Sequence, residues 1–554
     1  MPLEQLNNTS NDKHTIHNND SIQAKNIEPY PLNSILPEYL LCDQGKRVDL
    51  DILLLRKPRP DVHDATNQHH EQQIQPIPPN FIAKASVTQT LSQNTSDQKQ
   101  QNQWLQLGME AIRQGKCAVL GLAGGQGTRL GSTLPKGCFN LGLPSAKSLF
   151  QVQAERLHRL AILAGSHAGC IPWLLMTSPA THDATVDFFT QNNYFGLPKE
   201  SVWFFQQSQL PCIDAQSGQA MWMDSSCQQP VMSPNGNGGV YQALLDNGLL
   251  DRLSQQGITF MQVYSIDNIL VRMADPVFFG YAIANDLEAA AKCVRKRHAS
   301  ESVGVFCQRF KNQGKIHSDN EHEASDYSFG VVEYSELSAQ LSRQVQVQKQ
   351  SSSANTGQEN SIERLTEQFC LANIVNHCFS IAFLQRVCRP SNGSSNNADG
   401  CTASSDSSQL DSLPIHAAFK KIPFYDAVKG EMIEKPSKPN GYKLEMFIFD
   451  IFPLAKASSF GILEVNRSEE FAPLKNGMDS PDDNAQIARQ ALSAQHKRYL
   501  QAVGCKVIHR REGEGNDGCS DGCLVEVSSM VSYSGEGLQH MAGKGVYCGE
   551  HISA

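Results

Sequence analysis

The sequence predicts an α/β protein built on a mostly parallel sheet. Apolar strand segments alternate with helical segments between residues 104 and 266, which is typical of a parallel sheet with helices on both faces. The segment 117–122 (CAVLGL) is apolar throughout, as expected of a strand buried on both faces. A glycine-rich segment follows it directly and leads into a helical segment. The glycines are therefore expected at the carboxyl edge of the sheet, where open α/β folds bind ligands.

The other elements are predicted from the spacing of their apolar residues. A helix is expected at 104–114, before the first strand, and another at 148–164, after the glycine-rich segment. Further strands are predicted at 171–177, 201–205 and 258–266, and further helices at 181–191 (candidate core residues Val186, Phe188 and Phe189), 239–256 and 484–502. Strand-like segments follow at 505–509 and 523–532. No regular internal repeat is present, and no hexapeptide series indicates a left-handed β-helix.

Polar, low-complexity segments interrupt this pattern. The first 100 residues are rich in Asn, Gln, Ser, His and Asp, so 1–26 and 61–103 are expected to be poorly ordered, with short helices within 30–56. Polar insertions near 311–326, 340–362 and 389–412 are expected to form surface loops.

Composition excludes several functional classes. The net charge is −9 and no basic stripe is present, which argues against a nucleic-acid partner. No apolar run is long enough to span a membrane and no signal segment is evident, so a soluble, cytoplasmic protein is expected. The 16 cysteines are scattered, and we expect reduced, mostly buried thiols rather than a metal site or a disulfide framework.

The glycine-rich segment is suited to a polyphosphate. Gly124, Gly125 and Gly127 lack a Cβ, so the backbone can approach a bulky ligand and direct N–H groups at it. Arg129 and Lys136 add two cations a few residues later. The spacing matches neither the dinucleotide fingerprint G-x-G-x-x-G nor the P-loop G-x4-G-K-[S/T].

Two polar residues at strand ends add to this site. The glutamine at the end of 204–207 (FFQQ) offers an amide that can both donate and accept hydrogen bonds. Asp267 follows the apolar strand 258–266, and a single carboxylate beside phosphate oxygens is a suitable Mg²⁺ ligand. The alternative for Asp267 is a helix N-cap, although Asp275 is the better cap candidate.

The run LAGGQGTRLGSTLPKG, followed by LPSAKSLF, closely resembles the eukaryotic-type UDP-N-acetylglucosamine (UDP-N-acetylhexosamine) pyrophosphorylases. Further matching segments extend the resemblance over most of residues 105–540. They are FFQQ, SPNGNGG, YSIDN, VVEYS, NIVNH, KPNGYKLE, FAPLKN and SYSGEGL. The resemblance implies a Rossmann-like, GT-A-like nucleotidyltransferase fold with a mixed, mostly parallel sheet. It also implies three parts: an N-terminal accessory region (1–103), a catalytic domain (104–475) and a small C-terminal α/β domain rich in strands (476–554).

The resemblance also implies roles for individual residues. Catalysis is expected to involve Arg129, Lys136 and Lys443. The residues expected to bind UTP are Leu122, Ala123, Gly124, Gly125, Lys136, Gln207, Gly236 and Lys443. Those expected to bind the sugar are Asn237, Glu333, Tyr334 and Asn373, and Asp267 is the expected Mg²⁺ ligand.

Some assignments stay open at this point. Asn235 stands where the family usually has Asp, so any role of that carboxylate is in doubt. His377 is interpreted as a packed, hydrogen-bonded residue rather than a catalyst. Asp450 is either a second metal ligand or a structural anion, and Lys475 is a phosphate contact or a structural one.

The expected reaction forms UDP-N-acetylglucosamine and pyrophosphate from UTP and N-acetylglucosamine 1-phosphate, with Mg²⁺ as cofactor. The alternatives are a pyrophosphorylase for UDP-glucose or for several UDP-sugars, and a UDP-sugar-binding regulator without catalysis. An NAD-dependent dehydrogenase is disfavoured by the glycine spacing. Neither the choice between N-acetylglucosamine and N-acetylgalactosamine nor the oligomeric state follows from the sequence.

Overall fold

The structure is a computed structural model. The residues that it describes are 73–85, 96–166, 170–226, 229–310, 327–334, 336–337, 367–389, 409–508 and 523–553. They all belong to one compact unit, Asp51–Ala554. The expectations for 1–26, 30–56 and the polar insertions lie wholly or mostly outside the described residues.

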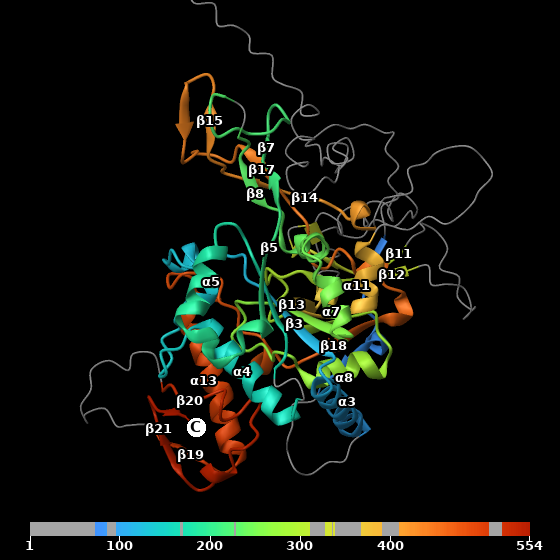
Figure 1. Cartoon of the computed structure of the whole chain (residues 1–554), viewed down its shortest axis with the longest axis vertical. Coiled ribbons are helices and arrows are strands. Elements are labelled where there is room, and N and C mark those ends of the chain that lie inside the picture. The colour runs from blue at the N-terminus through green and yellow to red at the C-terminus, as the bar shows by residue number, and fades with distance from the viewer. Residues whose placement is uncertain are drawn as a thin grey trace, which may run out of the picture. The chain divides into compact units, whose positions relative to one another are not determined.

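The central sheet is mixed but mostly parallel, as the sequence predicts (Figure 1). Its strand order is β2-β18-β10-β13-β9-β3-β4-β5, and a side branch joins β1, β11 and β12. Along the main path, β13 alone runs antiparallel to its neighbours β9 and β10. The bounds are β1 Gln73–Pro76, β2 Ile82–Lys84, β3 Cys117–Leu122, β4 Trp173–Thr177, β5 Val202–Gln206, β9 Phe260–Ser265, β10 Ala289–Arg295, β11 Val305–Phe310, β12 Tyr327–Val332, β13 Leu371–Ser380 and β18 Phe460–Glu464.

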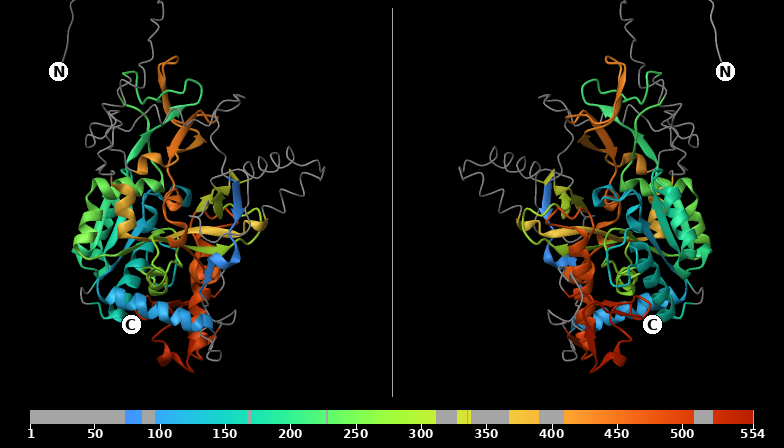
Figure 2. Two further views of the ribbon diagram at one scale, coloured as in Figure 1. Left: turned by 90° about the vertical axis from the view of Figure 1, so that its right-hand side faces the viewer. Right: turned by 90° about the vertical axis from the view of Figure 1, so that its left-hand side faces the viewer.

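Helices flank this sheet (Figure 2). Their bounds are α3 Ser96–Arg113, α4 Leu149–Ala164, α5 His182–Gln191, α6 Val240–Asp246, α7 Leu249–Gln255, α8 Pro276–Ala284, α11 Ile381–Cys388, α12 Arg467–Glu470 and α13 Ala485–Ala502. Side-chain caps stand at the start of α4 and α8, and that of α8 is the predicted Asp275. The Ser148 hydroxyl accepts a hydrogen bond from Gln151 N (3.2 Å) at the start of α4, and Asp275 Oδ1 accepts one from Val277 N (3.0 Å) at the start of α8.

The two faces of the sheet have separate cores, because successive strand residues point to opposite sides. Ala118, Leu120 and Leu122 of β3 pack in one cluster with residues of α6, α7 and α11. Cys117 and Val119 pack in the other cluster with residues of α3, α4 and α8. The prediction of helices on both faces is therefore confirmed.

The prediction of poor order is wrong for part of the range 61–103. The range 61–103 was expected to be poorly ordered, yet β1 and β2 lie within it and α3 begins at Ser96. β1 pairs antiparallel with β11, and β2 pairs in parallel with β18. These short segments gain order from strands far along the chain, so their local composition gave no signal for them.

The helix expected at 239–256 is broken. It forms α6 and α7, which are separated at Gly248, a residue with φ +63° that begins the second helix. In the helix expected at 181–191, Phe189 is fully buried, whereas Val186 and Phe188 are only half-buried. The expected strand 523–532 is reduced to β20, Glu526–Val527.

Small sheets lie outside the central one. β7 (Ile213–Asp214), β14 (His416–Lys420) and β17 (Gly441–Glu445) form one of them. Other strands of the described residues form two-stranded sheets: β6 (Gln209–Pro211) with β8 (Met232–Pro234), β15 (Phe424–Asp426) with β16 (Glu431–Ile433), β19 (Lys506–Ile508) with β21 (Gly545–Tyr547), and β20 with β22 (His551–Ile552). The last two pairs belong to a small core of their own with α13.

The cysteine prediction needs one correction. Cys523 and Cys548, in the C-terminal strand-rich part, form a disulfide with their Cα atoms 4.9 Å apart. These two cysteines are 25 residues apart in the sequence, so their local spacing gave no signal for the pair. Of the ten free cysteines in the described part of the chain, all except Cys170 and Cys370 are buried.

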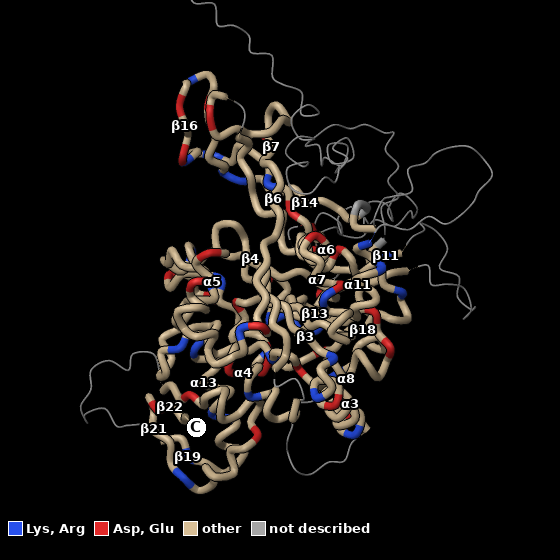
Figure 3. Tube along the Cα trace, viewed as in Figure 1, with Lys and Arg blue, Asp and Glu red and all other residues tan. Residues whose placement is uncertain are grey.

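Charges of both signs are interspersed along the described elements (Figure 3). Within the described ranges, no helix is both long enough and apolar enough to cross a membrane.

Two glycines bring α3 and α8 into backbone contact. A Cβ on Gly108 would lie 1.8 Å from the carbonyl oxygen of Pro276, and a Cβ on Gly280 would lie 1.7 Å from that of Trp104. The Trp104 and Tyr281 rings pack edge to face beside this contact, with their centroids 5.0 Å apart. The close packing of these helices therefore requires the absence of a side chain at both positions.

We predict that Gly108→Ala lowers the free energy of unfolding by about 1–3 kcal/mol, because the added methyl overpacks the helix contact. In an exposed helix a Gly→Ala substitution would instead raise the free energy of unfolding by roughly 1 kcal/mol. Urea unfolding checks the sign, with Gln106→Ala on the exposed face of α3 as the control. A gain in stability for Gly108→Ala would contradict the close contact.

Candidate functional site

The loop after β3 folds back on itself. Gly127 N donates to Leu134 O (3.1 Å), and Lys136 N donates to Gly125 O (3.2 Å), so the loop closes as a short hairpin. Gly131, at its turn, has φ +73°, which favours glycine. The fold-back returns Lys136 to the carboxyl end of β3, beside the first glycines.

Gln207 lies beside the first glycine of this loop. A Cβ on Gly124 would be 2.7 Å from Nε2 of Gln207, whose side chain is buried. Ser178, which follows β4, donates from Oγ to Gly124 O (2.9 Å). Leu122 and Ala123, the other expected UTP contacts in this segment, are buried at the end of β3. The loops after β3, β4 and β5 therefore meet at one edge of the sheet, as predicted.

Asp267 completes this group. Its Oδ2 lies 3.3 Å from Nζ of Lys136, and its Oδ1 accepts from Ser265 Oγ (2.8 Å). Both partners of the ion pair are mostly buried, with 16% and 14% of their side chains exposed. The end of β9 is thus joined to the loop after β3, and the cation and carboxylate expected at the phosphates are in contact. Asp275, not Asp267, caps α8.

Asn268 is a residue that the sequence analysis missed as a positioning group. It is 2% exposed, its Nδ2 donates to Glu470 O (2.7 Å), and its Oδ1 accepts from Ala472 N (3.0 Å) and Leu270 N (3.3 Å). Leu474 N also donates to the carbonyl of the preceding residue, Asp267 (2.9 Å). Its position next to Asp267 was visible in the sequence, but the segment that it binds lies about 200 residues later.

Arg129 is not brought into contact with the other expected phosphate-binding side chains. Its side chain is exposed, and no hydrogen bond or ion pair joins it to another of the described residues. Its backbone lies against the segment after α12, because a Cβ on Gly477 would be 2.8 Å from Arg129 O. Lys475 in that segment pairs with Asp483 at 3.9 Å, which favours the structural interpretation of that lysine.

Gly236 and Asn237 pack against the turn that follows β17. A Cβ on Gly236 (φ +83°) would lie 2.4 Å from Met446 O, so the close approach requires glycine. Asn237 Oδ1 accepts from Ile448 N (2.9 Å). Lys443 lies half-buried on β17, just before this turn, and its ammonium has no hydrogen-bond or ion-pair partner among the described residues.

Asn235, which replaces the family's usual aspartate, is buried and bonds to Ser208 in the loop after β5. Its Nδ2 donates to Ser208 Oγ (2.6 Å), and its backbone N donates to Ser208 O (3.2 Å). Met446 N donates to Asn235 O (2.8 Å). Ser208 adjoins Gln207, which lies beside Gly124. These bonds therefore connect the glycine-rich turn at 235–239 to the loop after β3.

Asn373 and Glu333, two of the residues expected to bind the sugar, lie beside the same glycine, Gly304. Asn373, on β13, donates from its backbone N to Gly304 O (2.8 Å), and Oε1 of Glu333 would be 3.2 Å from a Cβ on that glycine. Burial and then the Glu336 carboxylate raise the pKa of Glu333. Tyr334 is 51% exposed. On β13, Asn376 pairs with Tyr264 of β9, and Asn373 comes earlier in the strand. Because β13 runs antiparallel to β9, Asn373 lies at the edge of the sheet where β9 ends.

His416, on β14, lies between the carboxylates of Glu336 and Asp450. Its Nδ1 lies 3.2 Å from Glu336 Oε1, and its Nε2 lies 3.3 Å from Asp450 Oδ1. Burial alone would lower the pKa of His416, but hydrogen bonds to these two carboxylates raise it to about 9. Asp450 also accepts from Phe447 N (2.7 Å), which favours the structural-anion interpretation of that residue.

The donor set at the sheet edge fits a Mg²⁺ ion bound together with phosphates. Among the described residues, no group of three or more His, Cys, Asp or Glu side chains could hold a metal by itself. Asp267 offers one mostly buried carboxylate beside the loop after β3. Mg²⁺ commonly uses one or two carboxylates and takes its other ligands from phosphate and water.

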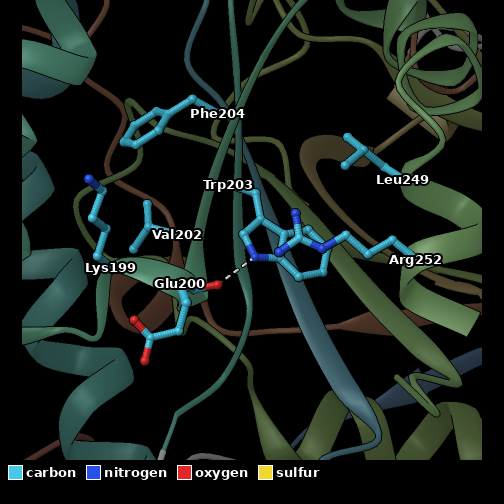
Figure 4. A pocket seen from close by; sticks show the side chains of 7 residues that line it. All are labelled: Lys199, Glu200, Val202, Trp203, Phe204, Leu249 and Arg252. Atoms are coloured by element: carbon cyan, nitrogen blue, oxygen red, sulfur yellow. Dashed lines mark hydrogen bonds between the residues drawn. The ribbon is translucent and has the colours of Figure 1, made fainter. Parts of the chain in front are cut away.

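A pocket of about 430 Å³ lies beside edge strand β5 (Figure 4). In it the Arg252 guanidinium lies 3.6 Å from the centre of the Trp203 ring, and Trp203 Nε1 donates to Glu200 O (2.8 Å). Its lining residues are Lys199, Glu200, Val202, Trp203, Phe204, Leu249 and Arg252, and none of them is a predicted site residue.

Comparison with known proteins identifies relatives along most of the chain. Residues 61–320 match the family described as UTP--glucose-1-phosphate uridylyltransferase. UDP-N-acetylglucosamine pyrophosphorylase of Saccharomyces cerevisiae is 39% identical over 476 residues, covering 85% of this chain and 83% of the relative. UDP-N-acetylglucosamine diphosphorylase 2 of Arabidopsis thaliana is 39% identical over 474 residues, covering 84% and 79%.

A solved structure agrees with the sequence comparison. The uridine diphosphate N-acetylglucosamine pyrophosphorylase of Trypanosoma brucei, in complex with inhibitor, matches with a TM-score of 0.63 and 29% identity. The match covers 84% of this chain and 82% of that one.

We predict that Asn268→Ala lowers the free energy of unfolding by about 3 kcal/mol, because it leaves buried backbone groups at residues 270, 470 and 472 without partners. Urea unfolding measures the change. Asn285→Ala is the matched control, because that asparagine is exposed and makes one local bond, to Tyr281 O. An equal loss in the two variants would contradict the role given to Asn268.

We predict that the stability difference between wild type and His416→Gln depends on pH. The folded pKa of about 9 exceeds the ordinary value of 6.5, so the stabilisation is complete below pH 6.5 and is lost as pH rises through 9. Melting temperatures should differ most near pH 6 and converge near pH 10. Exposed His540→Gln is the control, and a pH-independent difference for His416→Gln would refute the ion pairs.

Proposed function

The chain belongs to the UDP-N-acetylglucosamine pyrophosphorylase family, and from this we propose that it makes UDP-N-acetylglucosamine and pyrophosphate from UTP and N-acetylglucosamine 1-phosphate. It is a nucleotidyltransferase. The observation that carries the proposal for the site is the meeting of Lys136, Asp267 and Gln207 at the carboxyl edge of the sheet.

The reaction needs positioning and charge stabilisation more than proton transfer. The phosphate of the sugar 1-phosphate is already an ionised nucleophile, so no general base is required. It attacks the α-phosphorus of UTP in line with the departing pyrophosphate. The new P–O bond forms as the bond from the α-phosphorus to the bridging oxygen breaks, and pyrophosphate leaves with that electron pair.

The cations have separate places in this scheme. Arg129 and Lys136 hold the β- and γ-phosphates and offset the charge of the leaving group. Lys443 contacts the α-phosphate or the sugar phosphate from the other side. The absence of a protein partner for Lys443 and Arg129 among the described residues supports these roles, because each cation is available to a ligand.

Asp267 is the residue that would hold Mg²⁺. When bound, the ion supplies positive charge to the phosphate oxygens. Ser265 fixes one oxygen of this carboxylate and Lys136 lies at the other, so the carboxylate is oriented before substrate arrives.

The remaining residues bind the base and the sugar. Gln207 pairs with the uracil edge, beside the backbone of Leu122, Ala123, Gly124 and Gly125, and Gly236 packs against the uridine. Asn237, Glu333, Tyr334 and Asn373 surround the N-acetyl sugar. The backbone bond from Asn373 N to Gly304 O, and the closeness of Glu333 to that glycine, support a shared sugar site for these two residues.

We predict that Lys136→Ala and Lys443→Ala each lower kcat about 10²–10³-fold while folding is kept, because each removes charge that stabilises the transition state. Steady-state kinetics with UTP and N-acetylglucosamine 1-phosphate measures the loss. Lys420→Ala, an exposed lysine on neighbouring β14, is the control and should turn over normally. Near-normal kcat in either test variant would refute that residue's role.

The proposed reaction is tested by pyrophosphate release from UTP and Mg²⁺ with four sugar 1-phosphates: N-acetylglucosamine, N-acetylgalactosamine, glucose and galactose. We expect turnover with the N-acetyl sugars and little with the others. Equal turnover with glucose 1-phosphate would instead indicate a broad UDP-sugar pyrophosphorylase. Binding of UTP without turnover of any sugar would indicate a regulator without catalysis.

A further inference from the structure

Asn373 lies in an irregular part of β13. The register with β10 shifts between Ala291, which pairs with His377, and Cys293, which pairs with Asn373. Within this bulge Val375 has φ +50°, a conformation that is costly for a β-branched residue. Such strain persists only where the surroundings impose it, and here the bulge lies between Asn373 and His377.

Both lone pairs of the Asn373 amide oxygen are used inside the protein. Oδ1 accepts from Val375 N (3.0 Å) and lies 3.0 Å from Nε2 of His377. The amide nitrogen has no hydrogen-bond partner among the described residues. Asn373 is 7% exposed and His377 is fully buried, so these contacts are shielded from water. The geometry leaves only N–H donors of Asn373 for a ligand.

His377 is suited to hold the amide in this orientation. Burial lowers the pKa of His377 to about 3, so the ring is neutral and carries one proton. An amide oxygen can only accept, so that proton is on Nε2. Nδ1 is then a bare acceptor, which agrees with its being buried without a partner. The Phe452 ring packs edge to face on the imidazole at 4.9 Å between centroids.

The amide of Asn237 has the same arrangement, with its oxygen bonded inside the protein and its nitrogen left over. Its Oδ1 accepts from Ile448 N (2.9 Å), so its amide nitrogen is likewise the group left for a ligand. Asn237, in the turn before α6, and Asn373, on β13, thus both offer N–H donors. A complementary sugar must present acceptors, and an acetamide carbonyl is a stronger acceptor than the hydroxyl that replaces it in glucose.

We propose that His377 is a positioning residue that fixes the amide of Asn373 with its N–H groups toward the ligand, and thereby sets the preference for an N-acetyl sugar. The proposal rests on the proposed function, because it takes Asn373 to lie in the sugar site. His377 itself touches no reacting atom. It acts through Asn373, so its removal should change sugar preference more than it changes turnover.

The test compares His377→Gln with His377→Asn, measuring binding of UDP-N-acetylglucosamine and UDP-glucose by calorimetry. The Gln side chain places an N–H donor near the position of Nε2, whereas the shorter Asn does not reach Asn373. We expect Gln to keep the wild-type affinity ratio and Asn to lower it about tenfold, the loss of one oriented hydrogen bond. Equal ratios in the two variants would overturn the proposal.

A double-mutant cycle separates positioning from packing. In an Asn373→Ala background, His377→Asn should leave the affinity ratio unchanged, because its effect passes through the missing amide. A further tenfold loss in that background would contradict the proposal. The matched control is His496→Asn in α13, another buried histidine whose pKa burial lowers to about 3. Its Nδ1 accepts from Val527 N (3.1 Å), and the ratio should stay at the wild-type value.

A second variant serves if His377→Asn does not fold. Asn373→Asp keeps an oxygen for Val375 N and His377 but replaces the donor group with a second oxygen. We expect it to lose the preference for UDP-N-acetylglucosamine, and a retained preference would overturn the proposal. So would a wild-type protein that binds both UDP-sugars equally. Wild-type binding with preference but without turnover would count against the proposed reaction alone, because the affinity ratio stays measurable.

Discussion

The buried carboxamide of Asn268 holds together the phosphate side of the site. Its oxygen and nitrogen both pair with backbone groups, and a buried amide without such partners would be strongly destabilising. The loop after β9 is therefore fixed to the segment after α12, and Asp267 is fixed with it. The contact between Asp267 and Lys136 then determines where the loop after β3 ends. A single neutral side chain thus determines the relative positions of two charged ones.

Much of this site could be predicted because it depends on local signals. An apolar strand followed by glycines specifies where a loop leaves a parallel sheet, and such strand ends predict that Lys136, Gln207 and Asp267 lie at one edge. The helix at 239–256 failed for a local reason as well, since Gly248 adopts a left-handed conformation that the apolar spacing did not take into account.

The features that could not be predicted depend on partners distant in the sequence. The reversed direction of β13, the pairing of β2 and the Cys523–Cys548 disulfide are properties of the tertiary structure. Asn268 is adjacent to a predicted residue, but its importance lies in a segment about 200 positions away. The resemblance to a known family supplied the sugar-side residues, whereas their orientation comes from contacts such as that of His377 with Asn373.

The pairing of β2 with β18 has a consequence for folding during synthesis. Ile82 pairs with Ile462, about 380 residues later, so this edge of the sheet is not completed until most of the chain has left the ribosome. At roughly 5–20 residues per second, that interval lasts on the order of 20–80 s. β10, whose residues are almost all buried in the finished sheet, must wait for β18 as well. Between the synthesis of β10 and that of β18, about 170 residues later, the nascent protein therefore presents an unpaired apolar strand, which is the kind of surface that chaperones bind.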